Sequence, residues 1–444
     1  MYCKYCGKEI PKGSKKCPDC SEKKNNQNKS GLGLKLLLAF VILALVTTVL
    51  VLIITLGSQS PDNGSTTGTT ATTPTDGDPD KVFCKGSYSA GDDVVIAAKD
   101  TVVATMGEDK LTVGQLQVYY WMQVYDFLDY YGSYAPYMGL DYTKPLDTQI
   151  YDKETGMSWQ QFFLDEAVKS WQRYNALYQA AKTANFELPD DYKEYFEGLE
   201  ESLLKTAKEN KFETVDELIQ ADMGKAATFA DYEYYLIRYY YGYLYFSEKA
   251  EDFEATMDEI EAYFEKNAAD LKTQHGVTKD SGKLYDVRHI LVQPDGGLKD
   301  NSGNMTWNES EWAAGLTKAE RVYNEWKNGN KVDEESFAAM AVKYSADGNA
   351  AEGGLYSYIA KGKMVAEFEN WALDASRKYG DHAIVKTQYG YHIMYFVSCE
   401  EGWIRYSREG VMSEKANKYV DDLIAANSID PAWENVVLAV VELG

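Results

Sequence analysis

Two of the chain's four histidines lie in the middle of short apolar segments that have the composition of β-strands. His289 lies within residues 286–292 and His392 lies within residues 390–396. Because successive side chains on a strand point to opposite faces, each histidine would share a face with the apolar residues two positions away. Two imidazoles on neighbouring strands of one sheet would form a polar floor under an apolar surface. A single strand histidine is usually a core residue, so the matched pair is what indicates a site.

The residues between these strands add acidic, apolar and hydroxyl side chains to the pair. In chain order they form a helical apolar pattern ending in a Ser-Ala-Asp stretch, a Gly-Gly turn, an apolar segment with Met and Phe, and a closing strand. These segments are residues 337–347, 353–354, 361–369 and 385–396. Their order and spacing carry more information than any one of them does.

This order of segments resembles that of the parvulin-type peptidyl-prolyl isomerases, and the resemblance covers residues 283–399. It implies an α+β domain with a small antiparallel sheet flanked by helices. It also implies a catalytic group in which the histidines form the central pair: His289, Asp347, Thr387 and His392. The proline pocket and substrate-binding residues would be Met364, Phe368 and Tyr389, although the residue type at Tyr389 varies in this family.

The chemistry of prolyl isomerisation suits these residue types. Rotation about an X–Pro bond crosses a barrier of roughly 18–20 kcal/mol that arises from amide resonance. A dry pocket of Met364 and Phe368 would hold the proline ring, while the polar floor would favour the twisted amide. The reaction needs no metal, cofactor or covalent intermediate. Whether Asp347 acts electrostatically or only orients the histidines stays open at this point.

The loop after the first histidine strand bears on substrate choice. Selection of a phosphorylated residue before proline requires a cluster of Arg or Lys near the pocket. Residues 293–304 contain one lysine and two aspartates. We therefore expect an isomerase that is not specific for phosphorylated substrates.

The amino terminus contains two short Cys-x2-Cys pairs within residues 1–30. Four thiolates at this spacing can form a tetrahedral zinc site, and so short a segment would need the metal in order to fold. The segment resembles a zinc ribbon with structural Zn²⁺ bound by Cys3, Cys6, Cys17 and Cys20. Two disulfides are the alternative, and the ribbon's partner is unknown.

An uncharged run of 21 residues, 36–56, is long enough to cross a bilayer as a helix. Residues 1–35 carry nine Lys/Arg against three Asp/Glu, which places the amino terminus in the cytoplasm by the positive-inside rule. The sequence thus predicts a single-pass membrane protein with a transmembrane helix at 35–56. Its carboxy-terminal domains would be extracytoplasmic, and a Gly/Ser/Thr-rich flexible linker would cover 57–80.

Residues 81–282 are predicted to form a mostly helical domain. A strand near 101–106 leads into a helix with a capping box at Thr112 and Gln115, and Thr256 and Glu259 form another. The predicted helices are 113–131, 158–184, 190–210, 228–252 and 257–270. This region resembles, more loosely, the chaperone region of SurA- and PrsA-type foldases. Residues 400–444, with predicted helices at 413–426 and 431–441, would pack on it, so that the isomerase domain is inserted.

Composition bears on the partners of the chain. Its 36 tyrosines suit contacts with unfolded polypeptides that carry X–Pro bonds, although helical spacing predicts at least half of them as core residues. The net charge of −24 argues against nucleic-acid binding by the extracytoplasmic part. The two remaining cysteines, Cys84 and Cys399, are candidates for a disulfide.

Three functions remain open from the sequence. The first is a membrane-anchored isomerase and foldase for secreted or surface proteins. The second is a chaperone with a catalytically silent parvulin fold. The third is a membrane sensor that signals through the zinc ribbon, and the flexible linker weakens this possibility because it would transmit little conformational change.

Overall fold

The computed structural model describes residues 87–301 and 303–441, and these fall into two compact units. The sheet unit comprises residues 254–414, and the helical unit comprises residues 87–253 with 415–441. Helix α8 groups with the sheet unit, whereas the sequence had assigned it to the helical domain at 81–282. The predicted zinc ribbon, membrane helix and linker, together with Cys84, lie outside the described residues. No helix in the described ranges is long and apolar enough to cross a membrane.

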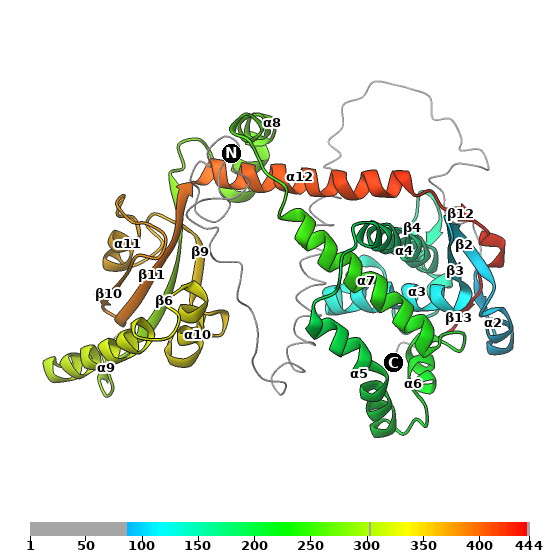
Figure 1. The fold of residues 1–444 in the computed structure, drawn as a ribbon, viewed down its shortest axis with the longest axis horizontal. Coiled ribbons are helices and arrows are strands. Elements are labelled where there is room, and N and C mark those ends of the chain that lie inside the picture. Colours follow the sequence, from blue (N-terminus) through cyan, green and yellow to red (C-terminus); the bar gives the residue numbers. More distant parts are fainter. Residues whose placement is uncertain (1–86, 302, 442–444) are drawn as a thin grey trace. The chain divides into compact units, whose positions relative to one another are not determined.

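The sheet unit is built on a four-stranded antiparallel sheet in the order β10-β11-β6-β9 (Figure 1). Helices α9 and α10 pack on one face, and α11 packs on the other. A small hairpin, β7–β8, follows β6. The elements are β6 (Lys283–Val292), β7 (Leu298–Lys299), β8 (Met305–Thr306), β9 (Leu355–Ala360), β10 (His382–Thr387) and β11 (Gly390–Glu401), with α8 (Met257–His275), α9 (Glu309–Lys327), α10 (Glu334–Tyr344) and α11 (Ala366–Ala372).

Helix α12 (Gly402–Ala426) continues directly from β11 and starts earlier than the predicted helix at 413–426. Within the sheet unit, Arg405 of this helix pairs with Asp286 of β6 at 2.8 Å, and both side chains are largely buried. Asp286 also accepts hydrogen bonds from Ser398 and from the backbone of Tyr358. This buried ion pair fixes the start of α12 on the sheet.

In the described residues, the helical unit contains six complete α-helices, the second half of α12 and several short strands (Figure 1). The capping boxes predicted at Thr112–Gln115 and Thr256–Glu259 are confirmed at the starts of α3 and α8. Helices α2 and α6 had no counterpart in the sequence prediction. The helices are α2 (Asp92–Ala98), α3 (Val113–Tyr131), α4 (Trp159–Thr183), α5 (Asp190–Glu209), α6 (Val215–Met223) and α7 (Phe229–Ala250), and the strands are β1 (Ser89–Ala90), β2 (Val102–Met106), β3 (Asp109–Thr112), β4 (Ile150–Asp152), β5 (Met157–Ser158), β12 (Asp430–Pro431) and β13 (Leu438–Ala439).

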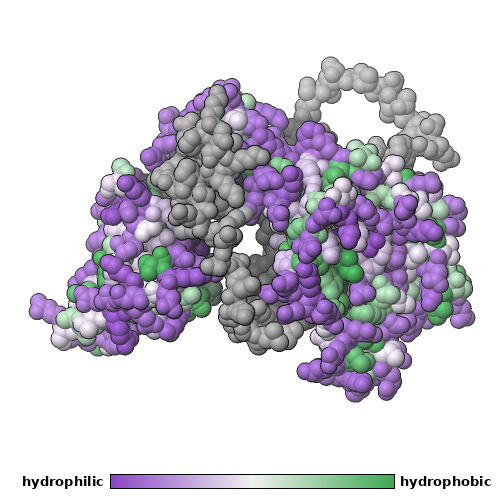
Figure 2. Space-filling view, viewed as in Figure 1, coloured by the Kyte–Doolittle hydropathy of each residue, from purple (hydrophilic) through white to green (hydrophobic). Residues whose placement is uncertain are grey.

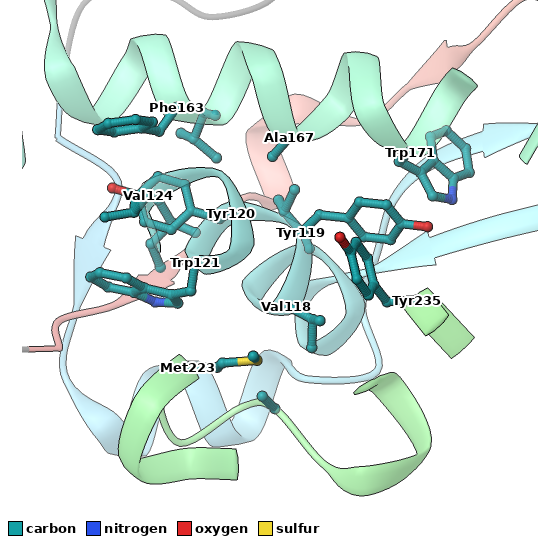
Figure 3. Close-up of a cluster of buried hydrophobic side chains, with 14 of the residues drawn as sticks. Val118, Tyr119, Tyr120, Trp121, Val124, Phe163, Ala167, Trp171, Met223 and Tyr235 are labelled. Carbon is teal, nitrogen blue, oxygen red and sulfur yellow. The ribbon is translucent and has the colours of Figure 1, made fainter. Parts of the chain in front are cut away.

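Aromatic side chains fill the core of the helical unit (Figure 3). Tyr120 of α3 packs against Phe163 of α4 with ring centroids 6.4 Å apart, and Tyr235 of α7 packs against Tyr119 with ring centroids 4.9 Å apart. Tyr119, Tyr120, Tyr235 and Tyr239 are all buried. These tyrosines are therefore core residues and do not present a surface to unfolded chains.

The helix predicted at 431–441 is wrong. This segment forms the two short strands β12 and β13 around a single 3-10 turn. Buried Gln117 of α3 donates to the carbonyl of Val437 and accepts from the amide of Ala439. Bonds of this kind, together with pairing to β1 and β2, satisfy the backbone better than a helix that begins at Pro431 could.

The described surface is largely hydrophilic in both units. On the face shown in Figure 2, hydrophobic residues lie in small separate patches. This distribution accords with the high charge of the sequence.

Candidate active site

The two histidines lie on the same face of the sheet, on its two central strands. His289 of β6 pairs in register with Met394 of β11, and His392 pairs with Leu291. Val287 and Met394 contribute to the apolar cluster under α11, which is the face that both histidines share. The alternation predicted from the sequence is confirmed, and the adjacent strands bring the two rings together diagonally.

The two imidazoles contact each other directly. Nδ1 of His289 lies 3.0 Å from Nδ1 of His392, and both side chains are buried, with exposed fractions of 1% and 5%. Nε2 of His392 lies 2.9 Å from Oγ1 of Thr387, which is also buried. Nε2 of His289 lies 3.7 Å from the carboxylate of Asp347. The structure thus brings together all four residues predicted to be catalytic.

The hydrogen bonds define one self-consistent arrangement of protons. Oγ1 of Thr387 accepts from the amide of Tyr389 at 3.1 Å, so the threonine hydroxyl is free to donate to Nε2 of His392. A neutral His392 then donates from Nδ1 to Nδ1 of His289, and His289 carries its own proton on Nε2. That proton faces the carboxylate of Asp347. The reverse arrangement would direct a lone pair of His289 at this negative charge.

Burial keeps both histidines neutral. It lowers the pKa of His289 to about 4, and the nearby Asp347 carboxylate offsets only part of that effect. Burial, together with a smaller effect of the neighbouring His289, lowers the pKa of His392 to about 3. An uncharged pair in an apolar setting therefore persists at neutral pH.

Backbone contacts at the end of β6 fix the position of Asp347. The amide of Ala346 donates to the carbonyl of Leu291 at 2.8 Å. The amides of Leu291 and Asp347 both donate to Oγ of Ser345, at 3.1 and 3.2 Å. The Ser-Ala-Asp stretch after α10 therefore runs along the strand that carries His289.

Gly354 permits the close approach of the next turn to this strand. Its φ of +67° is in the left-handed region, and a Cβ at this position would lie 2.1 Å from the carbonyl oxygen of His289. The carbonyl of Gly354 accepts the amide of His289 at 2.9 Å. Any other residue here would displace the backbone that holds His289.

An apolar wall borders the histidine pair. The ring of Phe368 on α11 meets both imidazoles edge-on, with centroids 5.5 Å from each, and Phe368 is 2% exposed. Met364 is half-buried and packs on the same apolar cluster. Tyr389 is different, because its side chain is 46% exposed and its contact with the site runs through its backbone amide.

Sequence reasoning missed two residues of the site. Tyr356 stacks on His289 with centroids 5.1 Å apart and donates its hydroxyl to Asp347 at 2.9 Å. The side-chain oxygen of Asn349 is buried without a hydrogen-bond partner in the described chain, as is Nε2 of His289. Asn349 lies two residues after Asp347, and Tyr356 lies two residues after Gly354. Tyr356 is on the histidine face because it pairs with Val287 of β6, and this register could not be read from the sequence of β9 alone.

Residues 270–398 match the family model of the PPIC-type PPIase domain. The chain contains a parvulin-type isomerase domain. The match covers the sheet and the four clustered residues His289, Asp347, Thr387 and His392, so the parvulin domain and the site coincide.

Relatives extend the similarity beyond the parvulin domain. The chain is 29% identical over 157 residues to the Foldase protein PrsA 2 of Listeria monocytogenes, covering 32% of this chain and 52% of that protein. It is 26% identical over 357 residues to the Foldase protein PrsA of Caldanaerobacter subterraneus, covering 78% of this chain and 91% of that protein. The chain therefore spans about half the length of the Listeria relative and most of the length of the Caldanaerobacter relative. The crystal structure of PrsA from Bacillus subtilis is 19% identical and covers 62% of this chain and 90% of that one, with a TM-score of 0.26, too low to establish a common overall fold.

Proposed function

We propose that this chain is a membrane-anchored, extracytoplasmic peptidyl-prolyl cis-trans isomerase and foldase that assists the folding of secreted or surface proteins. The observation that carries the proposal is the buried, neutral His289–His392 pair, bonded to Thr387 and bordered by Phe368. Such a site combines an uncharged polar pair with an apolar wall, and the carboxylate of Asp347 lies beside the pair.

The reaction needs no proton transfer, so the site works through its environment. The apolar wall of Phe368 and Met364 would hold the proline ring and exclude water, which otherwise stabilises the planar, charge-separated amide. A carboxylate at Asp347 disfavours negative charge on the carbonyl oxygen, and that charge is larger in the planar form than in the twisted one. The hydrogen bond from Thr387 fixes the tautomers of the two histidines, so the pair keeps the same hydrogen bonds while the X–Pro bond rotates.

The foldase part of the proposal is supported by the relatives and by the helical unit. The Listeria and Caldanaerobacter relatives are both named foldase proteins, and the match to the Caldanaerobacter protein extends over 78% of this chain. The clients would be unfolded or newly secreted polypeptides with X–Pro bonds. The loop at 293–304 lacks a basic cluster, so phosphorylated residues would not be preferred.

The proposed membrane anchor and the proposed zinc site are supported by the sequence. The uncharged run at 36–56 supports a single membrane helix, and the four cysteines Cys3, Cys6, Cys17 and Cys20 support one structural zinc ion. Added protease should degrade the parvulin domain and spare the amino terminus in intact cells, and metal analysis of the full chain should find one zinc per molecule. Loss of that zinc after replacement of Cys17 would support this cysteine as one of the ligands.

The isomerase activity can be tested by refolding of a protein whose slow phase is limited by proline isomerisation. We expect the wild-type chain to accelerate that phase and His289→Ala or His392→Ala to lose most of the acceleration. His275→Ala is the matched control, because His275 is exposed at the end of α8. If the wild-type chain leaves the slow phase unaltered, the proposed isomerase activity is wrong. If the wild type and the two histidine variants accelerate that phase equally, His289 and His392 are not the catalytic residues.

A further inference from the structure

Tyr356 lies in the candidate active site, yet the reaction as described above gives it no role. It pairs in register with Val287 of β6 and packs on the apolar cluster of the histidine face. Because β6 lies between β9 and β11, Tyr356 and His392 flank His289 from the strands on either side. Their ring centroids lie 5.1 and 5.2 Å from that of His289. The imidazole of His289 therefore cannot turn without displacing one of these rings.

The hydroxyl of Tyr356 controls how Asp347 presents its carboxylate. It donates to Oδ1 of Asp347 at 2.9 Å, and the amide of Asn349 donates to the same oxygen at 3.2 Å. The other oxygen, Oδ2, is the one that lies 3.7 Å from Nε2 of His289. Two donors on Oδ1 thus direct Oδ2 at the imidazole, and rotation of the carboxylate would break both hydrogen bonds.

The hydrogen bond between Tyr356 and Asp347 can run in only one direction. Burial, and after it the hydrogen bond to Asp347, raise the pKa of Tyr356 to about 12, so the phenol keeps its proton at neutral pH. An ionised carboxylate can only accept. The contact between the two imidazoles is different, because a neutral histidine can donate or accept at Nδ1. The fixed bond can therefore impose its direction on the adjustable one.

The turn before Tyr356 is tied to the strand that carries His289. Nη1 of Arg288 donates to the carbonyl of Gly353 at 3.0 Å, and its Nε pairs with Glu334 of α10 at 2.9 Å. The Arg288 side chain is largely buried in this position. A change that removes only the hydroxyl of Tyr356 therefore leaves the backbone and the ring in place.

We propose that Tyr356 is a positioning residue that sets the proton order of the histidine pair through Asp347. The inference rests on the proposed isomerase function and adds a second determinant to the same site, at the opposite end from Thr387. With Oδ2 of Asp347 directed at His289, the proton of this imidazole belongs on Nε2, and its Nδ1 must accept from His392. Without the Tyr356 hydroxyl, only one donor holds Oδ1 and the carboxylate can rotate. The reverse proton order then becomes populated.

The first test is NMR of the full chain with isotope-labelled histidine, which shows which ring nitrogen carries the proton. Signals lost in His289→Ala and in His392→Ala assign the two rings. We expect His289 to be protonated on Nε2 in the wild type, and Tyr356→Phe to show both proton orders. Tyr323→Phe is the matched control, because it removes a hydroxyl that lies 2.6 Å from Nδ1 of His382 on the opposite face of the sheet. The control should leave the signals of His289 unchanged.

The second test is the kinetics of isomerisation of a short X–Pro peptide. We expect Tyr356→Phe to lower kcat about tenfold with KM unchanged, because the lost hydroxyl faces Asp347 while the ring stays on the apolar cluster. In combination with Thr387→Val, the loss should be smaller than the product of the two single losses, since both changes act on one chain of protons. Tyr323→Phe should leave kcat and KM unchanged.

The two tests separate the role of Tyr356 from the proposed enzyme. A single, unchanged proton order in Tyr356→Phe would overturn the proposal. So would a higher KM with kcat unchanged, which would assign the hydroxyl to substrate binding, or losses that multiply in the double variant with Thr387→Val. If Tyr356→Phe mixes the proton orders and the wild type does not isomerise, the positioning role stands and the proposed enzyme fails.

Discussion

The histidine face of the parvulin domain and the connection between α3 and α4 in the helical unit depart from the usual pattern of burial in opposite ways. In the parvulin domain, polar side chains are buried, with His289 and His392 almost inaccessible. In the helical unit, large aromatic side chains are exposed, as Tyr134 and Tyr137 show. Hydrogen bonds between the buried polar groups, such as those that join His289, His392 and Thr387, fix one geometry and suit recognition of one kind of bond. Exposed rings impose no such pairing, so they do not fix the geometry of their surroundings.

The largest effect should follow from removing the apolar wall of the histidine face. Phe368→Ala deletes a buried ring that contacts both imidazoles, and we expect a loss of about 3–5 kcal/mol in the free energy of unfolding. Isomerase activity should fall with it. Denaturation followed by hydrogen exchange would locate the loss in the sheet unit. A cost as small as that of an exposed substitution would show that the pocket is not packed as described.

The next effect concerns the proton arrangement of the pair. Thr387→Val leaves Nε2 of buried His392 without its donor, at a cost of about 1–3 kcal/mol. We expect kcat/KM for a short X–Pro peptide to fall about tenfold, while Thr387→Ser, which keeps the hydroxyl, restores most of it. If valine and serine behave alike, the hydroxyl does not set the tautomer.

Acid should affect the two units in opposite directions. Histidine in an unfolded chain has a pKa of about 6.5, whereas burial lowers the pKa of His289 to about 4 and that of His392 to about 3. The unfolded state then binds protons first, so this contribution to stability is full above the unfolded pKa and is lost as the pH falls towards the folded values. In the helical unit, burial and Asp129 raise the pKa of Asp126 to about 6, so acidification adds stability there.

Hydrogen exchange, corrected for the intrinsic exchange rate, can measure the opening free energy of each unit between neutral and mildly acidic pH. The sheet unit should lose protection as the pH falls, and the segment around Asp126 should gain it. Parallel losses in both units would contradict the pKa directions that distinguish them.

The smallest effect should follow from truncating an exposed ring. Tyr137→Ala removes a side chain that is 89% exposed, and we expect a change of less than about 0.5 kcal/mol in the free energy of unfolding. Tyr119→Ala, in the buried core, is the contrasting variant. Comparable losses from Tyr137 and Tyr119 would show that the exposed ring contributes to the stability of the fold as a core ring does.

Much of the parvulin domain could be predicted from the sequence, because strand alternation and motif order act over short distances. The histidine pair, Thr387 and Asp347 come together as predicted, and the pocket wall includes Phe368. Tyr356 was missed because its role depends on how β9 pairs with β6, which no local pattern specifies. Tyr389 is a substrate-binding residue only by resemblance, since its ring is directed to solvent.

The helical unit shows where local patterns fail. The capping box at the start of α3 could be predicted, because it depends on only four consecutive residues, 112–115. The segment at 431–441 has helix-like composition, yet its backbone pairs with strands more than 300 residues away. Likewise, the sequence could not separate core tyrosines such as Tyr119 from surface ones such as Tyr137, because burial depends on the packing of several helices.

The pH dependence of isomerisation tests the central claim most directly. The claim is that a neutral, buried His289–His392 pair forms the catalytic floor. With pKa values of about 4 and 3, kcat/KM for a short X–Pro peptide should stay constant from about pH 8 to about pH 5.5, where an unperturbed histidine would be mostly charged. A rate that falls with a midpoint near the ordinary histidine pKa, or no catalysis at any pH, would contradict the account.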